Sequence, residues 1–203
     1  MDPGFWLVYL FLASLSLAGC ATPGENFPVA LSYQGEPPSL ARQEAANHVV
    51  VFPFEDGRAD PRSVGRHLHV FGQVDSFESE LPVGRRVAEL LVTSLKERGW
   101  DARLAKPGLS PRDLPGEGGQ DLADRVVTGT VQSLWAEAVS HFGYTEINAQ
   151  LSIRVEIQNL KTGEKTTLSI DNQNDPKVLF FQPKQLQQTL NDLISSGLNR
   201  ILP

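Results

Sequence analysis

The chain has a single cysteine among its 203 residues and fewer basic than acidic side chains. One cysteine cannot form an intramolecular disulfide, so we expect the fold to be stabilised by packing rather than by covalent cross-links. Lys and Arg number 18 and Asp and Glu number 24, which gives a formal net charge of −6 at pH 7. Proteins that bind nucleic acid concentrate positive charge on one face, so this composition predicts no nucleic-acid partner.

Signatures of catalysis are also absent from the sequence. There is no Gly-x-Ser-x-Gly elbow, no His-Glu-x-x-His and no phosphate-binding Gly-x-x-x-x-Gly-Lys. Glu55 with Asp56, and Glu78 with Glu80, are pairs of acids, but their spacing gives no sign of a cleft from which water is excluded. We therefore expect a protein that is not an enzyme and that has no cofactor.

The apolar run over residues 5–17 is too short to cross a membrane. Its thirteen residues would extend about 20 Å as a helix, against a hydrocarbon core of roughly 30 Å. The string Leu17-Ala18-Gly19-Cys20 follows and is typical of a bacterial lipobox. We interpret residues 1–19 as a lipoprotein signal peptide, cleaved between Gly19 and Cys20, although no Lys or Arg precedes the run. The alternative is an N-terminal core helix with a buried cysteine.

A lipidated Cys20 would anchor the protein in a lipid bilayer of the bacterial envelope. The next residue is Ala21 rather than Asp, which favours the outer membrane, with the protein facing the periplasm. Residues 20–47 contain four prolines and two glycines and predict a flexible tether, in which 29–33 is a candidate extra strand. Residues 48–203 predict one globular domain.

Within that domain, five segments have the pattern of strands and two that of helices. In residues 144–158, Ala149, Leu151, Ile153, Val155 and Ile157 alternate with polar side chains, as in a sheet with one buried face. The other expected strands are 49–54, 101–104, 125–135 and 165–171. Apolar residues recur at helical spacing over 82–99 and 183–202. The prediction is an α+β fold, with an antiparallel or mixed sheet of about five strands and two helices packed on one face.

Several short sequence strings match those of a known family in residue type and in their order along the chain. They are Phe52-Pro53-Phe54-Glu55-Asp56-Gly57-Arg58, then Val64-Gly65, then Leu95-Lys96-Glu97-Arg98-Gly99-Trp100, and finally Asn191-Asp192-Leu193. In these the chain resembles the YajG-type bacterial envelope lipoproteins over most of residues 48–202. Members of that family are envelope lipoproteins without an assigned activity, so the resemblance implies a protein class and a place in the cell envelope rather than a mechanism.

Asp56 and Arg58 flank a glycine directly after the first expected strand. One interpretation is an ion pair that fixes the turn, and the other is a polar docking edge for a partner. His67 and His69 would share one face of an extended segment, a spacing that suits metal ligands. Two ligands are too few, and no nearby Cys or patterned acid completes a set, so we expect no metal site.

The apolar string 178–181 is expected to pack under the last helix; if exposed, it would contact a partner or lipid. The function that fits these features is a membrane-anchored envelope lipoprotein that presents a small binding domain to a protein complex or envelope polymer in the periplasm. The alternative is a lipid-handling accessory lipoprotein of a transport system, which would need a pocket above about 300 Å³ lined by Leu and Val. The sequence does not name the envelope protein partner.

Overall fold

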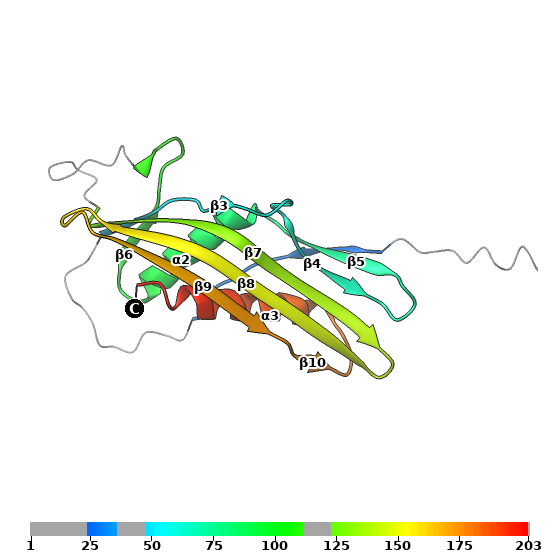
Figure 1. The fold of residues 1–203 in the computed structure, drawn as a ribbon. Helices are drawn as coiled ribbons and strands as arrows, with labels where there is room; N and C mark the ends of the chain where they lie inside the picture. The colour runs from blue at the N-terminus through cyan, green and yellow to red at the C-terminus, as the bar shows by residue number, and fades with distance from the viewer. Residues whose placement is uncertain (1–23, 36–47, 112–122, 203) are drawn as a thin grey trace, which may run out of the picture.

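The computed structural model describes residues 24–35, 48–111 and 123–202, which form an open mixed sheet with two helices on one of its faces (Figure 1). The strands are β1 (Asn26–Val29), β2 (His48–Val51), β3 (Glu55–Asp56), β4 (Ser63–Leu68), β5 (Val74–Ser79), β6 (Asp101–Leu104), β7 (Arg125–His141), β8 (Tyr144–Asn159), β9 (Lys165–Asn174) and β10 (Lys177–Val178). The helices are α2 (Val83–Glu97) and α3 (Pro183–Leu198).

Two long antiparallel strands, β7 and β8, form the centre of the sheet. They pair from Arg125 opposite Asn159 to His141 opposite Tyr144, with one irregularity between Val131 and Ser133. At about 3.4 Å per residue, the 16 residues of β8 span roughly 50 Å. This hairpin defines the long axis of the molecule, with the β7–β8 turn at one end and the β8–β9 turn at the other (Figure 1).

The edge of β7 that faces away from β8 is shared by three short strands. β2 pairs with its first residues, β3 with its middle and β4 with residues 136–139, all in parallel. β5 then pairs antiparallel with β4, and β6 lies parallel to β2 at the far edge. On the other side, β9 and β10 both pair antiparallel with β8.

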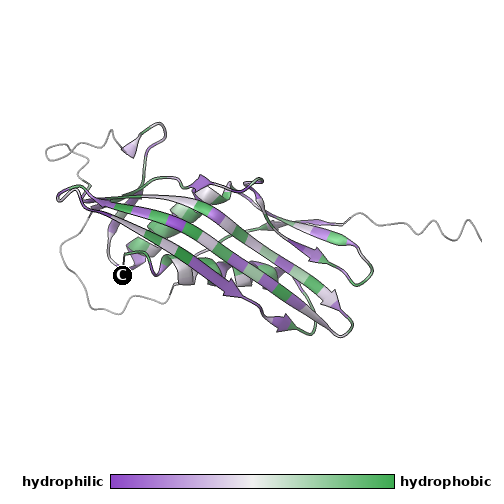
Figure 2. Cartoon of the chain, in the orientation of Figure 1, coloured by the Kyte–Doolittle hydropathy of each residue, from purple (hydrophilic) through white to green (hydrophobic). Residues whose placement is uncertain are grey.

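The alternation predicted for residues 144–158 is confirmed, because the odd positions from Ile147 to Ile157 are buried under the helices. Figure 2 shows the same alternation as bands along β7 and β8. Gly99 terminates α2 as expected. It lies two residues after Glu97, the last helical residue, and its φ of +86° suits glycine. The N–H of Trp100 donates to the carbonyl of Leu95 and that of Gly99 to Lys96, which is a Schellman motif.

The α+β class and the two helices are confirmed, but the sheet has ten strands rather than about five. Among the described residues, β3, β4, β5 and β10 were not expected, and β1 only overlaps at Val29 with the candidate extra strand at 29–33. They are two to six residues long, and several carry polar residues at inward positions. Apolar alternation therefore did not reveal them. β7 also continues to His141, six residues beyond its expected end.

Residues 24–35 lie on the domain, within the range in which the sequence predicts a tether. β1 pairs in parallel with β5 at the edge of the sheet. Phe27 stacks on Phe77 with ring centroids 5.3 Å apart, and Val29 and Leu31 are buried in the core. The edge strand falls at 26–29 rather than 29–33, because Phe27 and Val29 then face the core together. The packed part of the chain thus begins well before His48; residues 36–47 lie outside the described residues.

Candidate functional site

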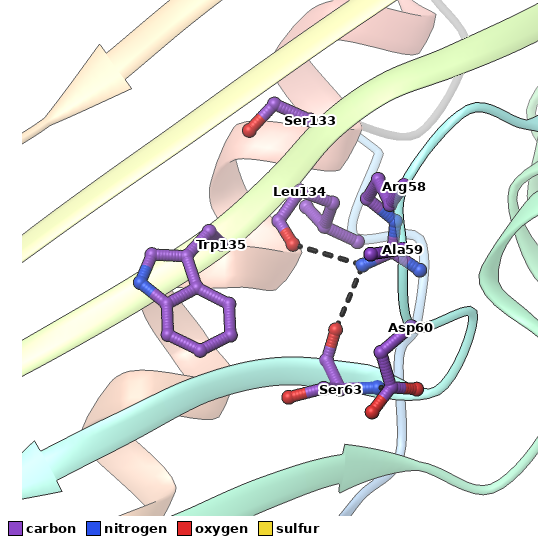
Figure 3. A pocket seen from close by; sticks show the side chains of 7 residues that line it. All are labelled: Arg58, Ala59, Asp60, Ser63, Ser133, Leu134 and Trp135. Atoms are coloured by element: carbon purple, nitrogen blue, oxygen red, sulfur yellow. Dashed lines mark hydrogen bonds between the residues drawn. The ribbon is translucent and has the colours of Figure 1, made fainter.

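Arg58 and Asp56 meet in the turn after β3, as the sequence predicts. Arg58 Nε and Nη2 donate to the two carboxylate oxygens of Asp56, each at 2.8 Å. Arg58 Nη1 donates to the carbonyls of Ser63 and Leu134, at 2.8 and 3.1 Å, and Nη2 to that of Pro61 at 3.0 Å (Figure 3). All five N–H groups of this guanidinium are therefore used inside the protein.

Burial alone would raise the pKa of the Asp56 carboxyl. The hydrogen bonds and the positive charge of Arg58 outweigh this effect and lower the pKa below its ordinary value. The pair is mostly buried, with 10% of the Arg58 side chain and 14% of the Asp56 side chain exposed. This geometry is that of a fixed turn; a docking role for Asp56 and Arg58 stays a prediction.

Beside this turn lies a hollow of about 330 Å³ between β4 and β7. Figure 3 shows the side chains that line it, which are Arg58, Ala59, Asp60, Ser63, Ser133, Leu134 and Trp135. Trp135 is half-buried there and offers an apolar ring at the rim. The hollow therefore combines the aromatic surface of Trp135 with an exposed acid, Asp60, beside the Arg58 guanidinium.

His67, His69 and Asp75 come together on the hairpin formed by β4 and β5. His69 Nε2 lies 2.6 Å from Asp75 Oδ2, and His67 Nδ1 lies 3.5 Å from the same oxygen. The expectation that no acid completes the histidine pair is wrong. Asp75 is contributed by the neighbouring strand, where a pattern read along β4 alone does not find it.

Burial and hydrogen bonds shift the pKa values of His67 and Asp75. Burial, and then the nearby charge of His69, lower the pKa of His67, so its ring is neutral at pH 7. Burial alone would raise the pKa of Asp75. The N–H of Glu25 and the ring of His69 outweigh it and lower the pKa, which keeps the carboxylate ionised.

Large apolar side chains are exposed at the same end of the molecule. Phe71 in the β4–β5 turn is 92% exposed, Phe142 in the β7–β8 turn 86%, and Phe180, after β10, 83%. We call the residues of these three loops the apolar end; its exposed apolar members are Val70, Phe71, Val74, Phe142, Tyr144, Leu179 and Phe180. Figure 1 shows the three loops together, beyond the arrowheads of β4 and β7.

The strand pairings also place these three loops at the same end of the molecule. Leu68, at the end of β4, pairs with Val139, close to the β7–β8 turn. Val178 of β10 pairs with Thr145, directly after that turn. The string 178–181 therefore packs only in part as expected: Leu179 and Phe180 are exposed, whereas Val178 and Phe181 pack against the core, Phe181 against the rings of His67 and Phe77.

A hollow of about 390 Å³ also opens at the apolar end. It is lined by Tyr144, Lys177, Val178 and Leu179. The ammonium of Lys177 lies 5.5 Å from the centre of the Tyr144 ring. The hollow thus has apolar walls with one cation at its edge.

The chain enters the domain at this end. Glu25 lies beside Asp75, at the beginning of β5, and donates its N–H to Asp75 Oδ1 at 2.9 Å. Because β1 runs parallel to β5, Gly24 and Glu25 lie beside the first residues of β5, next to the β4–β5 turn. Gly19 and Cys20, the predicted cleavage and lipidation residues, lie outside the described residues and stay predictions.

No protein-family model matches the chain, and no curated protein matches it. Similar solved structures exist. A Xanthomonas campestris protein described by the DUF330 family model is 8% identical, with a TM-score of 0.55 over 87% of this chain and 92% of that one. The chain therefore has the fold of that bacterial protein, while membership in the YajG-type family stays a prediction.

Two more remote structures come from proteins of other Gram-negative bacteria. The PelC dodecamer from Paraburkholderia phytofirmans is 15% identical, with a TM-score of 0.44 over 80% of this chain and 91% of that one. Lipoprotein GNA1162 from Neisseria meningitidis is 12% identical, with a TM-score of 0.36 over 75% and 98%. Likenesses this distant support no argument about function. Among the described residues, neither helix is long and apolar enough to span a bilayer.

Proposed function

We propose that the protein is a lipid-anchored lipoprotein of the bacterial envelope, without catalytic activity. Its domain rests on the periplasmic face of the membrane through the apolar end and presents the rest of its surface to an envelope protein complex or polymer. The observation that carries this proposal is the point of entry of the chain. The strand that follows the lipobox joins the domain beside Phe71 and the other exposed apolar side chains of that end.

The length of the connection supports the proposal. Only five residues lead from Cys20 to Glu25, whose N–H is bonded to Asp75. Five residues reach at most about 18 Å even when fully extended. A lipid on Cys20 would therefore hold the β4–β5 turn close to the bilayer surface. The domain would be carried on a short connection rather than on the flexible tether over residues 20–47 that the sequence alone predicts.

The chemistry of the apolar end suits a lipid surface. Phe71, Phe142 and Phe180 are each more than 80% exposed and come from three separate loops. Exposing apolar surface to water costs a free energy of about 25 cal/mol for each Å². Insertion of these side chains between acyl chains removes that cost. Since the connection brings this end to the bilayer, we assign the membrane as its occupant rather than a second protein.

Lipid attachment is tested by labelling cells with radioactive palmitate. Cys20 is the only cysteine of the chain, so we expect the label in the wild type and none in Cys20→Ser. Immunoblots of both proteins control for expression. An unlabelled wild type, or a Cys20→Ser variant that keeps its label, contradicts the proposal.

The hollow at Tyr144 and Leu179 favours the second candidate function, a lipid-handling accessory lipoprotein. Its volume of about 390 Å³ exceeds the roughly 300 Å³ expected of a small ligand site. Its lining of Tyr144, Lys177, Val178 and Leu179 is more mixed than the predicted lining of Leu and Val. Under the helices, Leu186, Leu190 and Ile194 are fully buried. Mass spectrometry of the purified protein would show a stoichiometric non-covalent lipid, lost in a Val178→Trp variant, if this second function holds.

A further inference from the structure

We propose that His67, His69 and Asp75 bind one zinc ion through His67 Nδ1, His69 Nε2 and Asp75 Oδ2. One ligand atom from each of the three residues lies within 4.8 Å of the ligand atoms of the other two. The site is built on the β4–β5 hairpin, at the base of the turn that carries Phe71. It does not depend on lipidation of Cys20.

The register of the hairpin places the three side chains on one face. His67 lies directly opposite Asp75 in the antiparallel pair of β4 and β5, which brings their Cβ atoms to about 5 Å. His69 follows His67 by two residues and therefore points to the same side. The rings of His67 and His69 accordingly lie 4.0 Å apart between centroids.

The distances are close to those of a zinc site. Ligand atoms about 2.1 Å from a tetrahedral zinc ion are about 3.4 Å from one another. His67 Nδ1 and Asp75 Oδ2 are 3.5 Å apart and already fit. His69 Nε2 is 2.6 Å from the same oxygen, so it must move outward by less than 1 Å. Its side chain is 35% exposed and has room for that movement.

The remaining polar atoms of the inner two ligands have other partners. His67 Nε2 is 2.8 Å from Ser140 Oγ, which is itself 2.9 Å from Thr145 Oγ1. Asp75 Oδ1 accepts the N–H of Glu25. When Ser140 accepts from His67 Nε2, the Nδ1 lone pair of His67 faces the carboxylate. Such outer hydrogen bonds orient the ligands of metal sites in proteins.

The donor set selects the ion. Two imidazoles and one carboxylate suit zinc, whereas magnesium and calcium prefer sites made only of oxygen. Both histidines would coordinate as neutral imidazoles, each through one ring nitrogen. Three protein ligands leave a fourth position, which water can take on the exposed side of His69.

A bound ion would also stabilise the entry of the chain into the domain. Asp75 would coordinate zinc with one oxygen and accept from Glu25 with the other. Phe181 covers the His67 ring, with centroids 4.1 Å apart. Zinc would thus link β4, β5 and the residue preceding β1 at the base of the apolar end.

Calorimetric titration of the purified full-length chain with zinc chloride tests the site. All samples carry Cys20→Ser, which removes the one thiol that competes for zinc, and none carries a polyhistidine tag. We expect one zinc ion per chain. His69→Ala should weaken binding at least 100-fold, and because His69 is partly exposed this variant should fold. His141→Ala, which removes an exposed histidine 3.9 Å from Glu146, is the matched control and should bind as the wild type does.

Two further readouts separate coordination from surface binding. Cobalt in place of zinc should give the strong visible absorption of a tetrahedral site, absent in His69→Ala. Ser140→Ala, which removes the partner of His67 Nε2, should weaken zinc binding about tenfold. The proposal is overturned by equal affinity of wild type and His69→Ala, or by the absence of binding at millimolar zinc.

Discussion

The carboxylate of Asp75 accepts the backbone N–H of Glu25 at 2.9 Å and thereby fastens the incoming chain to the second strand of the β4–β5 hairpin. Glu25 is the fifth residue after the expected lipid attachment point. The same carboxylate contacts two histidines with its other oxygen. One buried acid therefore connects the entry of the chain, the proposed zinc site and the apolar end.

Removing this acceptor should loosen the entry of the chain. In Asp75→Ala we expect the amides of residues 24–29 to exchange with deuterium at least tenfold faster, since a lost hydrogen bond of about 1.4 kcal/mol corresponds to that factor. Peptide-resolved exchange mass spectrometry measures it. Glu78→Ala, on the same strand, is the control and should leave these amides unchanged. Equal protection in wild type and Asp75→Ala would show that Asp75 does not hold the segment.

Arg58 should prove essential for stability. Arg58→Ala removes the guanidinium that donates to Asp56 and to the carbonyls of Ser63 and Leu134. Because the pair is mostly buried, we expect a loss of about 3 kcal/mol in the free energy of unfolding, measured with urea. The control is Arg66→Ala, whose partner is Glu137 and whose side chain is half exposed; it should cost less than about 1 kcal/mol. A stable Arg58→Ala variant that has lost a partner would instead favour the docking interpretation.

Asp56 should make stability depend on acid pH. Its pKa in the folded protein lies below the ordinary value of 3.8. The ionised carboxylate therefore contributes stability above pH 3.8, and this contribution disappears as the pH falls through the lower pKa of the folded state. In urea titrations from about pH 6 to pH 2, the unfolding free energy of Asp56→Asn should fall less steeply than that of the wild type. Parallel curves for the two proteins would exclude this role.

Gly65 should be irreplaceable where β4 joins β7. A Cβ at this position would collide with the backbone carbonyl of Ala136, its partner in the parallel pair. Gly65→Ala must push the strands apart, and we expect a cost above about 2 kcal/mol in chemical unfolding. At Gly57, a Cβ would meet its nearest atom at 3.4 Å. Gly57→Ala should therefore cost clearly less, and a similar cost for both variants would contradict the steric explanation.

The parts of the fold that sequence predicts are those with long regular patterns. Residues 144–158 alternate between apolar and polar side chains, and α2 combines an amphipathic pattern with a stop at Gly99. β4 and β5 were not predicted because their inward-facing residues include His67, Asp75 and Ser79, which are buried without being apolar. The cluster of His67, His69 and Asp75 was not predicted either. It depends on the register between β4 and β5, which cannot be read from the sequence alone.

Exposure was the harder property to predict. Leu179 and Phe180 carry the same apolar pattern as a buried strand, and they lie in a loop because β10 ends at Val178. Phe71 and Phe142 are single aromatics in polar turns, and nothing in their local sequence connects them. Only the pairing of β4 with β7, and of β10 with β8, brings these loops to one end of the molecule.

The central claim is that the apolar end lies on the membrane and the β8–β9 turn does not. In the proposed mature lipoprotein the lipid occupies Cys20, the only cysteine of the natural sequence, so that an introduced cysteine would be the only free thiol. Nitroxide labels at Phe142→Cys and Glu164→Cys stand at opposite ends of the hairpin, roughly 50 Å apart.

Electron paramagnetic resonance power saturation on the protein reconstituted in phospholipid vesicles measures the accessibility of each label to oxygen and to a water-soluble nickel complex. The account predicts that the label at position 142 is reached by oxygen and shielded from nickel, while that at position 164 is fully open to nickel. Equal nickel accessibility at both positions would contradict it.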